Sequence, residues 1–397
     1  NDCVVAYRRT LFTTGDPNVY QNRWLPLSRL QTRIRNAHKA LIDAGHFDAA
    51  ALILKDFHPL FSQTEVLSIQ AQSLKQYGES RLVPQPAIDR PESRKRARMG
   101  RVYLRRAGQA FEELAALHFT TRSYTDILWD AANCYFQGQS YTHAARILKE
   151  YLKYEAISRR PQALVLLGQS LLAEGKYDEC ISVLEECITL HQQDVAAYKA
   201  RIICSHAYRE RGEMDRATQM LKDNFSDDTL TPKSREWQDT LFYYGVLLHE
   251  TGHYEQAINK LTEAVDRNVS QAILARYLVA NAYRQAATGP LQRYQKAQGD
   301  NEREKQIKFF NHYLTAAANH YHKVQQALTV ASADGELNAL DQAILRNSYF
   351  LRGSVLFDLR QYDAALEVLR NAGPKGQEAI RILKRQTRAN VWPNVKL

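Results

Sequence analysis

Three histidines on one predicted helix come nearest to the spacing of a metal site. They are His312, His320 and His322. His322 follows His312 by ten residues, so at most two of the three rings share one helix face. No Asp, Glu or Cys stands at helical spacing to complete a zinc-type ligand set. We therefore interpret them as exposed or half-buried histidines, and we expect neither a metal nor a cofactor.

Motifs that would support catalysis are missing from the sequence. It has no Gly-rich phosphate loop, no His-Glu-x-x-His, no Gly-x-Ser-x-Gly and no paired Cys-x-x-Cys. The sequence therefore predicts a protein that is not an enzyme and has no small-molecule substrate.

The cysteines do not form a disulfide framework. Four of the five fall inside predicted helices, and Cys180 and Cys187 lie on the same one. Seven residues of helix separate these two by about 10 Å along the axis, which is too far for a disulfide. We interpret the helical cysteines as small core residues: Cys134, Cys180, Cys187 and Cys204.

A basic stretch, RPESRKRARMGRVYLRR at 90–106, carries much of the excess charge of a chain with net charge +10. Four of its arginines would line one stripe of a helix: Arg94, Arg98, Arg101 and Arg105. We favour a solvated or locally ion-paired helix face. An acidic protein partner, nucleic acid or an anionic membrane surface are the alternatives, because such a stripe can follow a row of phosphates.

One ten-residue pattern recurs along the chain. GKYDECISVL at 175 has counterparts at 45, 139, 212, 252 and 360, and three of the intervals are 36, 37 and 40 residues. Each copy has a turn residue, an aromatic or Met, a small residue three positions later and a large apolar residue four beyond that. A fixed period of this length indicates a stacked array of helical hairpins.

Another helix precedes each turn and is the first helix of the hairpin. It carries small residues such as Gly168, Gly245 and Gly353. Small residues allow two antiparallel helices to approach closely, and the large apolar ones fill the groove between neighbouring pairs. This recurring pattern resembles the tetratricopeptide repeat (TPR), in the style of bacterial members, over most of the chain. The resemblance implies an all-α fold, a right-handed superhelical α-solenoid.

We count about eight TPR-like helix pairs and a closing helix at 376–388 that caps the last apolar face. Residues 1–27 are expected to be an extended N-terminal segment that begins with a short helix. Residues 28–118 hold N-terminal pairs with a loop insertion at 79–96, 125–267 a central array, and 271–397 the last pairs with a polar insertion at 288–303. The pairs are 28–60, 64–118, 125–158, 161–192, 196–224, 236–267, 271–330 and 343–373.

The resemblance also implies a binding site on the concave face, where TPR arrays commonly hold extended peptides or partner helices. The residues carried over are Asn133, Gln137, Gln169, His206, Arg209, Glu210, His249, Glu250, Asn281, Arg284 and Gln285. Asn133 and Asn281 match the amide that often bonds the backbone of a bound peptide in the family. The family's carboxylate clamp also needs Lys or Arg four residues before this Asn, where this chain has Trp129 and Tyr277. We therefore expect no clamp for an acidic C-terminal peptide. The plain alternative is a solvated polar face.

These observations predict a non-catalytic scaffold that binds a protein or peptide partner. The alternatives are a nucleic-acid or anionic-membrane binder using the basic stripe, and a regulatory or assembly domain of a larger enzyme or cell-envelope complex. No apolar run approaches the ~18 residues of a membrane span. We expect a soluble chain, either cytoplasmic or the extracytoplasmic part of a bacterial envelope protein. Because it begins with Asn1, a leader or anchor could precede it.

Overall fold

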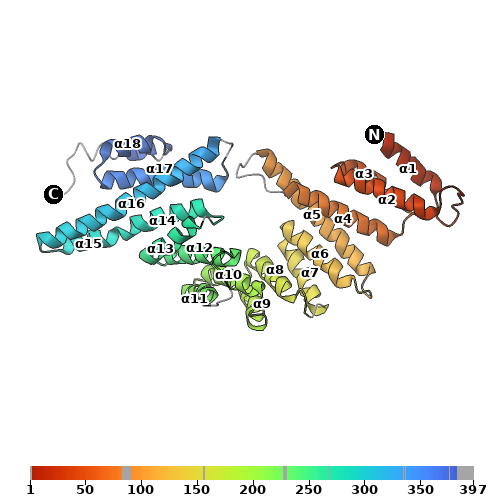
Figure 1. Ribbon diagram of the computed structural model, residues 1–397, viewed down its shortest axis with the longest axis horizontal. Helices are drawn as coiled ribbons and strands as arrows, with labels where there is room; N and C mark the ends of the chain where they lie inside the picture. The colour runs from red at the N-terminus through yellow and green to blue at the C-terminus, as the bar shows by residue number, and fades with distance from the viewer. Residues whose placement is uncertain are drawn as a thin grey trace. The chain divides into compact units, whose positions relative to one another are not determined.

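The computed structural model describes residues 2–82, 91–154, 157–226, 230–267, 269–333, 335, 337–374 and 376–381. This part of the chain is built from α-helices and contains no extended strand, as the repeat pattern predicts (Figure 1). The helices follow one another as hairpins, so the chain is an all-α helical-repeat solenoid. Right-handed coiling of the array stays a prediction.

Two compact units make up the structure, and their boundary lies between Ile203 and Cys204, within helix α10. The helices of the first unit are α1 (Asp2–Thr14), α2 (Leu27–Asp43), α3 (Phe47–Leu54), α4 (Gln63–Leu82), α5 (Pro91–Leu117), α6 (Tyr124–Gln137), α7 (Tyr141–Tyr154), α8 (Arg160–Ala173) and α9 (Tyr177–Leu190), followed by the start of α10 (Val195–Glu210). The second unit holds the rest of α10 with α11 (Met214–Phe225), α12 (Arg235–Glu250), α13 (Tyr254–Asp266), α14 (Ala272–Ala286), α15 (Thr288–Lys296), α16 (Asp300–Ala333), α17 (Ala339–Asp358) and α18 (Tyr362–Arg370).

The turn residue of each repeated pattern has a left-handed backbone conformation. Four of the six predicted turn residues are glycines with φ between 74° and 79°: Gly45, Gly175, Gly212 and Gly252. The other two are Gln139, with φ of 55°, and Arg360, with φ of 63°. Glycine adopts this conformation without the steric cost that a Cβ brings. The same backbone therefore forms at all six turns, whichever residue occupies them.

A small residue on the first helix of a hairpin faces a leucine on the second. A Cβ built on Gly168 would lie 2.5 Å from Leu184, and one on Gly353 would lie 2.4 Å from Leu369. Both leucines are buried. Because the contact leaves no room for a methyl group, the small residue fixes how closely the two helices approach.

The N-terminal segment 1–27 begins with a helix, as expected, and is therefore not extended throughout. Residues 2–14 form α1, which packs against α3. Buried Leu11 joins the apolar cluster of the first hairpin, which includes Ile34, Ile53 and Phe57. This apolar contact accounts for the helix, whose anchoring residues show no repeat period in the sequence.

The expected loop insertion at 79–96 is also largely helical at its ends. Helix α4 continues to Leu82, and α5 begins at Pro91, a residue suited to the first helical turn. A side-chain hydrogen bond links the two helices near this end of the hairpin: Arg96 Nη2 donates to the carbonyl of Ser80 at 2.8 Å. Residues 83–90 lie outside the described residues.

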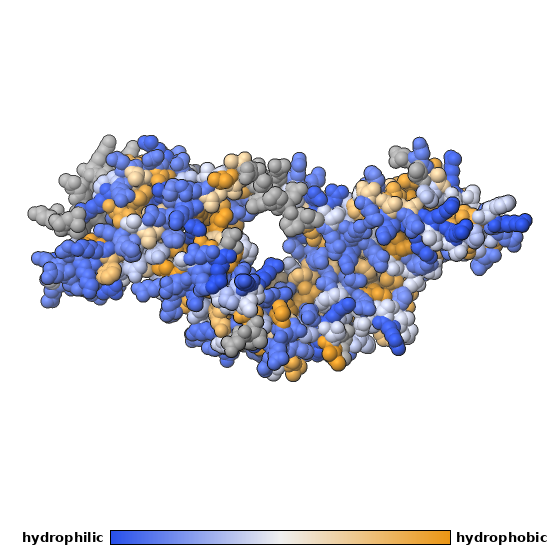
Figure 2. All heavy atoms as spheres, in the orientation of Figure 1, coloured by the Kyte–Doolittle hydropathy of each residue, from blue (hydrophilic) through white to orange (hydrophobic). Residues whose placement is uncertain are grey.

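In the second unit, the insertion at 288–303 forms helical structure where a polar interruption was expected. Residues 288–296 are α15, and α16 already begins at Asp300. Arg293 donates to Gln306 at 3.0 Å, which ties α15 to α16. Hydrophilic side chains dominate the outer ends of these two helices on the face shown in Figure 2, consistent with a polar sequence that is nevertheless helical. Of the expected closing helix at 376–388, residues 376–381 are helical and the remainder lies outside the described residues.

The four helical cysteines are buried, as predicted for small core residues. Burial raises the pKa of Cys134 to about 12 and that of Cys180 to about 11. Among the described residues, no helix combines the length and the apolar character that a bilayer crossing requires.

Replacing Gly168 by Val should destabilise the chain by about 1–3 kcal/mol, because the added atoms overlap buried Leu184. The measurement is the thermal unfolding midpoint. Gly168→Val should cost less stability in the Leu184→Ala background than in the wild type, because the smaller side chain at position 184 makes room for the added atoms. Equal effects of Gly168→Val in both backgrounds would contradict the packing explanation.

Replacing Gly252 by Ala should destabilise the chain by about 1 kcal/mol for a different reason. Nothing lies within 4 Å of the added Cβ, and the backbone has φ of 79°, so the cost is conformational. Gly299 is a matched control, because its Cβ also meets nothing within 4 Å and its φ lies outside the left-handed region. Gly299→Ala should leave the midpoint unchanged or raise it slightly. A similar loss in both variants would rule out turn strain as the cause.

Candidate functional site

The predicted binding residues of the first unit lie on the first helices of their hairpins. Asn133 is half-buried on α6, and its Nδ2 donates to the carbonyl of Trp129 at 2.8 Å, one turn earlier on the same helix. Gln137 is exposed at the end of α6, and Gln169 is half-buried on α8. The amide of Asn133 is therefore folded back on its own helix and does not extend toward a partner.

In the second unit, His206 is brought against an aromatic ring of the next hairpin. His206 on α10 and Tyr243 on α12 meet edge to face with ring centroids 4.4 Å apart. The Nε2 atom of His206 is buried and has no hydrogen-bond partner. Buried polar atoms are nearly always bonded, so this nitrogen is an exception within the fold.

Charged residues continue the same face. Arg209 Nη2 donates to Glu210 at 2.9 Å on α10, and its other terminal nitrogen lies 3.8 Å from Glu250 on α12. The second contact crosses from one hairpin to the next. The positive charge of Arg209 is thus balanced within the protein, which leaves no strong local excess of either sign at this end.

The next helix, α14, adds an amide and a guanidinium. Asn281 Oδ1 accepts a hydrogen bond from the hydroxyl of Tyr321 on α16 at 2.5 Å. The neighbouring Arg284 has a buried Nε without a partner, although its guanidinium also reaches Tyr321. On α12, His249 repeats the feature, because its buried Nε2 has no partner either.

The two histidines of this face are neutral near physiological pH. Burial, and secondarily the positive charge of Arg209, lower the pKa of His206 to about 4. Burial and the charge of Arg284 also lower the pKa of His249. A neutral imidazole nitrogen either donates or accepts a hydrogen bond, depending on its tautomer.

We call this surface the first-helix face of the second unit. Its members come from three successive first helices and are His206, Arg209, Tyr243, His249, Glu250, Asn281 and Arg284. Three of them present buried nitrogens without partners. The arrangement suits the binding of groups that offer both hydrogen-bond donors and acceptors, and it places no nucleophile beside an activating base.

Sequence reasoning missed Tyr243 and Tyr321. Tyr243 lies seven residues before Glu250, a spacing that puts both side chains on one helix face and could have identified it. Tyr321 lies on the second helix of its hairpin and is fully buried, and its position in the sequence is typical of a core residue. No spacing rule separates its hydroxyl contact to Asn281 from an ordinary core tyrosine.

The basic stripe on α5 divides into two parts. Arg94, Arg98 and Arg105 are exposed and Arg101 is half-buried, and both Arg101 and Arg105 contact the turn of the next hairpin. Arg105 Nη1 donates to the carbonyl of Gly138 at 3.2 Å, and Arg101 bonds the side chain of Gln139. Two of the four arginines therefore help to pack the hairpins together. A contact with nucleic acid, anionic lipid or an acidic protein stays a prediction.

The three histidines of α16 have different neighbours. His312 is exposed, His320 stacks on Tyr283 with centroids 5.6 Å apart, and His322 lies 2.9 Å from Arg352 of α17. Within the described ranges, no group of three His, Cys, Asp or Glu side chains could hold a metal ion.

Comparisons with known proteins agree with the repeat pattern. The sequence model of the family described as anaphase-promoting complex, cyclosome, subunit 3 matches residues 107–187, and that of the tetratricopeptide repeat matches residues 347–372. No curated protein matches the chain in sequence.

Solved structures of repeat proteins resemble the chain in fold. The C-terminal part of a TPR repeat-containing protein from Cytophaga hutchinsonii is similar over 71% of this chain and 95% of its own, with 12% identity and a TM-score of 0.50. MamA is similar over 51% of this chain and 93% of its own, with 18% identity and a TM-score of 0.36. YrrB, described as a TPR protein with an unusual peptide-binding site, covers 41% of this chain and 77% of its own, with 20% identity and a TM-score of 0.33. At these identities the likeness shows fold alone.

The lowered pKa of His206 predicts a loss of stability in acid. Between pH 6.5 and about 4 the unfolded chain binds a proton at this residue that the folded chain does not, so the free energy of unfolding falls as pH falls. His206→Gln removes this titration. From pH 7 to pH 5 the unfolding free energy of the wild type should therefore fall by about 1–2 kcal/mol more than that of His206→Gln.

Thermal or urea unfolding at a series of pH values measures this difference. His46→Gln is a suitable control, because His46 is already exposed at a turn. A wild-type curve that runs parallel to that of His206→Gln across this range would refute the prediction.

Proposed function

Because the chain is a tetratricopeptide-repeat protein, we propose that it is a non-catalytic scaffold that holds an extended segment of a protein partner. The segment lies across the first-helix face of the second unit. The observation that carries this proposal is the set of buried, unpartnered nitrogens on successive first helices: His206 Nε2, His249 Nε2 and Arg284 Nε. Each such nitrogen carries an unmet hydrogen bond, and a ligand can supply it once neighbouring side chains move aside, because less than 1 Å² of each atom is accessible.

An extended peptide fits these nitrogens better than a partner helix does. Backbone N–H and C=O groups of an extended chain remain free to bond outward, whereas a helix uses nearly all of them internally. The histidines are neutral, and peptide groups satisfy either tautomer. Arg209 is already balanced by Glu210 and Glu250, so the face supports recognition of backbone groups more than of a highly charged sequence.

The proposal can be tested by selecting peptides from a random displayed library on the purified chain. Peptides that bind the wild type should lose about tenfold or more in affinity for Arg284→Gln, because a hydrogen bond to a charged donor is removed. Fluorescence anisotropy with a labelled selected peptide gives the dissociation constants. Unfolding midpoints of both proteins verify that the variant is folded.

Arg216→Gln is a matched control, since Arg216 lies on α11, a second helix, and is largely exposed beside Glu213. Its affinity for the peptide should equal that of the wild type. Failure to select any peptide, or equal losses in Arg284→Gln and Arg216→Gln, would overturn the assignment to this face.

A further inference from the structure

The basic stretch of α5 carries a strong local charge. From Ser93 to Phe111 the chain has seven Lys and Arg residues and no Asp or Glu. These cations are Arg94, Lys95, Arg96, Arg98, Arg101, Arg105 and Arg106. A positive surface of this density attracts polyanions and raises their local concentration. The stretch belongs to the first unit, so a site here is independent of the peptide-binding face proposed in the second.

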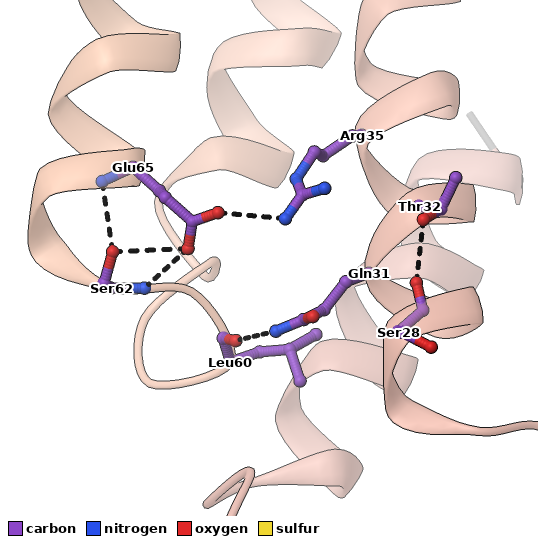
Figure 3. Close-up of polar contacts among 7 residues, drawn as sticks. All are labelled: Ser28, Gln31, Thr32, Arg35, Leu60, Ser62 and Glu65. Atoms are coloured by element: carbon purple, nitrogen blue, oxygen red, sulfur yellow. Dashed lines mark hydrogen bonds and ion pairs between the residues drawn. The ribbon is translucent and has the colours of Figure 1, made fainter.

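The fold does not pair these cations with carboxylates. Elsewhere in the first unit, arginines link helices through ion pairs: Arg35 on α2 pairs with Glu65 on α4 at 2.9 Å (Figure 3), and Arg146 on α7 pairs with Glu112 at 2.7 Å. Among the described residues, no ion pair is formed by six of the seven cations, namely Lys95, Arg96, Arg98, Arg101, Arg105 and Arg106. Their positive charge is therefore not cancelled within this part of the chain.

Neutral acceptors hold two of the arginines in place. Arg105 Nη1 donates to the carbonyl of Gly138, and Arg101 bonds the side chain of Gln139. These bonds restrain each guanidinium without removing its charge, and each keeps further N–H donors for a ligand. A restrained side chain loses less conformational entropy on binding. The arginines are thus both positioned and charged.

The basic stripe forms a straight row along α5. Arg94 and Arg105 are separated by eleven residues of helix, or about 16 Å along its axis, with Arg98 and Arg101 between them. A nucleic-acid strand presents a phosphate at every nucleotide whatever its sequence. An extended peptide presents side chains on one side only at every second residue, so it would need a specially patterned run of acids. The row therefore suits a phosphate backbone best.

A membrane surface fits the same helix less well. Over the described residues 92–116, Met99 is the one large apolar side chain that is exposed, whereas Leu104 and Phe111 are buried in the hairpin. Helices that lie on lipid combine cations with an apolar face that enters the acyl region. The apolar face of α5 is already used inside the protein.

An open depression of about 710 Å³ begins at Arg105, between α5 and α7. Gln109, Ser140 and His143 contribute hydrogen-bonding groups to its lining. The exposed ring of His143 is stacked on Tyr135, with centroids 5.1 Å apart. A base attached to a phosphate at Arg105 has room in this depression, and an aromatic ring there offers a surface on which bases stack.

Two carboxylates complete the lining of the depression. Glu112 is bonded to Arg146 and accepts from the hydroxyl of Tyr135 at 3.1 Å, so its charge is balanced. Glu113 lies eight residues past Arg105 and accepts from Gln109 at 3.1 Å. Both lie beyond the basic stripe, where they can accept from the amino groups of bases instead of opposing the phosphates.

We propose that the basic stripe binds the phosphate backbone of a single nucleic-acid strand, with one base in the depression beside His143. Because α4 and α6 both pack against α5, its exposed row can follow one strand and cannot enter the major groove of a duplex. RNA and DNA share this chemistry. The two are distinguished by comparing an oligouridine with an oligothymidine.

Fluorescence anisotropy on the full chain, with labelled strands of about 12 nucleotides, tests the stripe. The variant Lys95→Gln/Arg98→Gln removes two exposed cations that no described residue pairs or bonds. It should weaken binding about tenfold or more at about 0.1 M salt, and reduce the slope of log affinity against log salt by about 1.4, because each phosphate contact contributes about 0.7. The tighter of the two strands identifies RNA or DNA as the source.

Arg33→Gln/Lys39→Gln is the matched control, because both residues are exposed on α2 and the net charge falls by the same amount. Its affinity and salt slope should equal those of the wild type. Equal losses in the two double variants, or no binding of either strand by the wild type at low salt, would overturn the proposal.

A strand with abasic deoxyriboses tests the depression, since it keeps the phosphates of oligothymidine and lacks the bases. The wild type should bind it about fivefold more weakly than oligothymidine, the effect of one stacked base. His143→Gln should remove most of that preference and leave the salt slope unchanged. A preference that persists in His143→Gln would refute the placement of the base.

Competition identifies the class of polyanion. Unlabelled single strands should displace the labelled strand at lower charge concentration than duplex DNA, polyglutamate, or vesicles of phosphatidylcholine and phosphatidylserine. Stronger displacement by polyglutamate would assign the stripe to an acidic protein, and stronger displacement by vesicles would assign it to a membrane. Either result, or a preference for duplex, would contradict single-strand binding.

Discussion

The structure depends on one contact, the close approach of two helices within each hairpin. A leucine lies nine residues after the left-handed turn residue in all six copies of the pattern: Leu54, Leu148, Leu184, Leu221, Leu261 and Leu369. All six are buried, and Leu184, Leu261 and Leu369 each lie against a glycine of the preceding helix. Because most helices of these six hairpins are short, they are marginal alone, and this packing stabilises them.

That constraint also decides where function can reside. Leucines and small residues are committed to the seam within a hairpin, so only the outer faces of the helices and the spaces between hairpins are free to vary. The first-helix face of the second unit is of the first kind. Its distinguishing atoms are buried nitrogens without partners, on His206, His249 and Arg284.

Much of the fold could be predicted from the sequence because the repeated contact has a fixed spacing. The six turn residues, including Gln139 and Arg360, were located by position alone, and the structure gives each a positive φ. The helical parts of the two insertions were missed, and the packing of α1 was not foreseen, because each is stabilised by contacts particular to one place. Leu11 in the first apolar cluster and Arg293 on Gln306 are examples.

The candidate site was predictable in part. The spacing of first-helix residues indicated His206, Arg209, His249 and Arg284, yet it could not show which nitrogens lack partners, since that depends on side chains from neighbouring helices. The same spacing suggested Asn133 equally strongly, and its amide instead bonds its own helix. Whether a polar residue is available to a partner is a property of the packed structure.

The buried thiols have a practical consequence. They lie in three consecutive hairpins, with Cys134 on α6, Cys180 and Cys187 on α9, and Cys204 on α10. A thiol this deeply enclosed reacts with an alkylating reagent only when its own helix separates from the array, and burial also raises the pKa of Cys134, Cys180 and Cys187. These three hairpins therefore carry native reporters, whose trapping rates would record which hairpin opens first and whether its neighbours open with it.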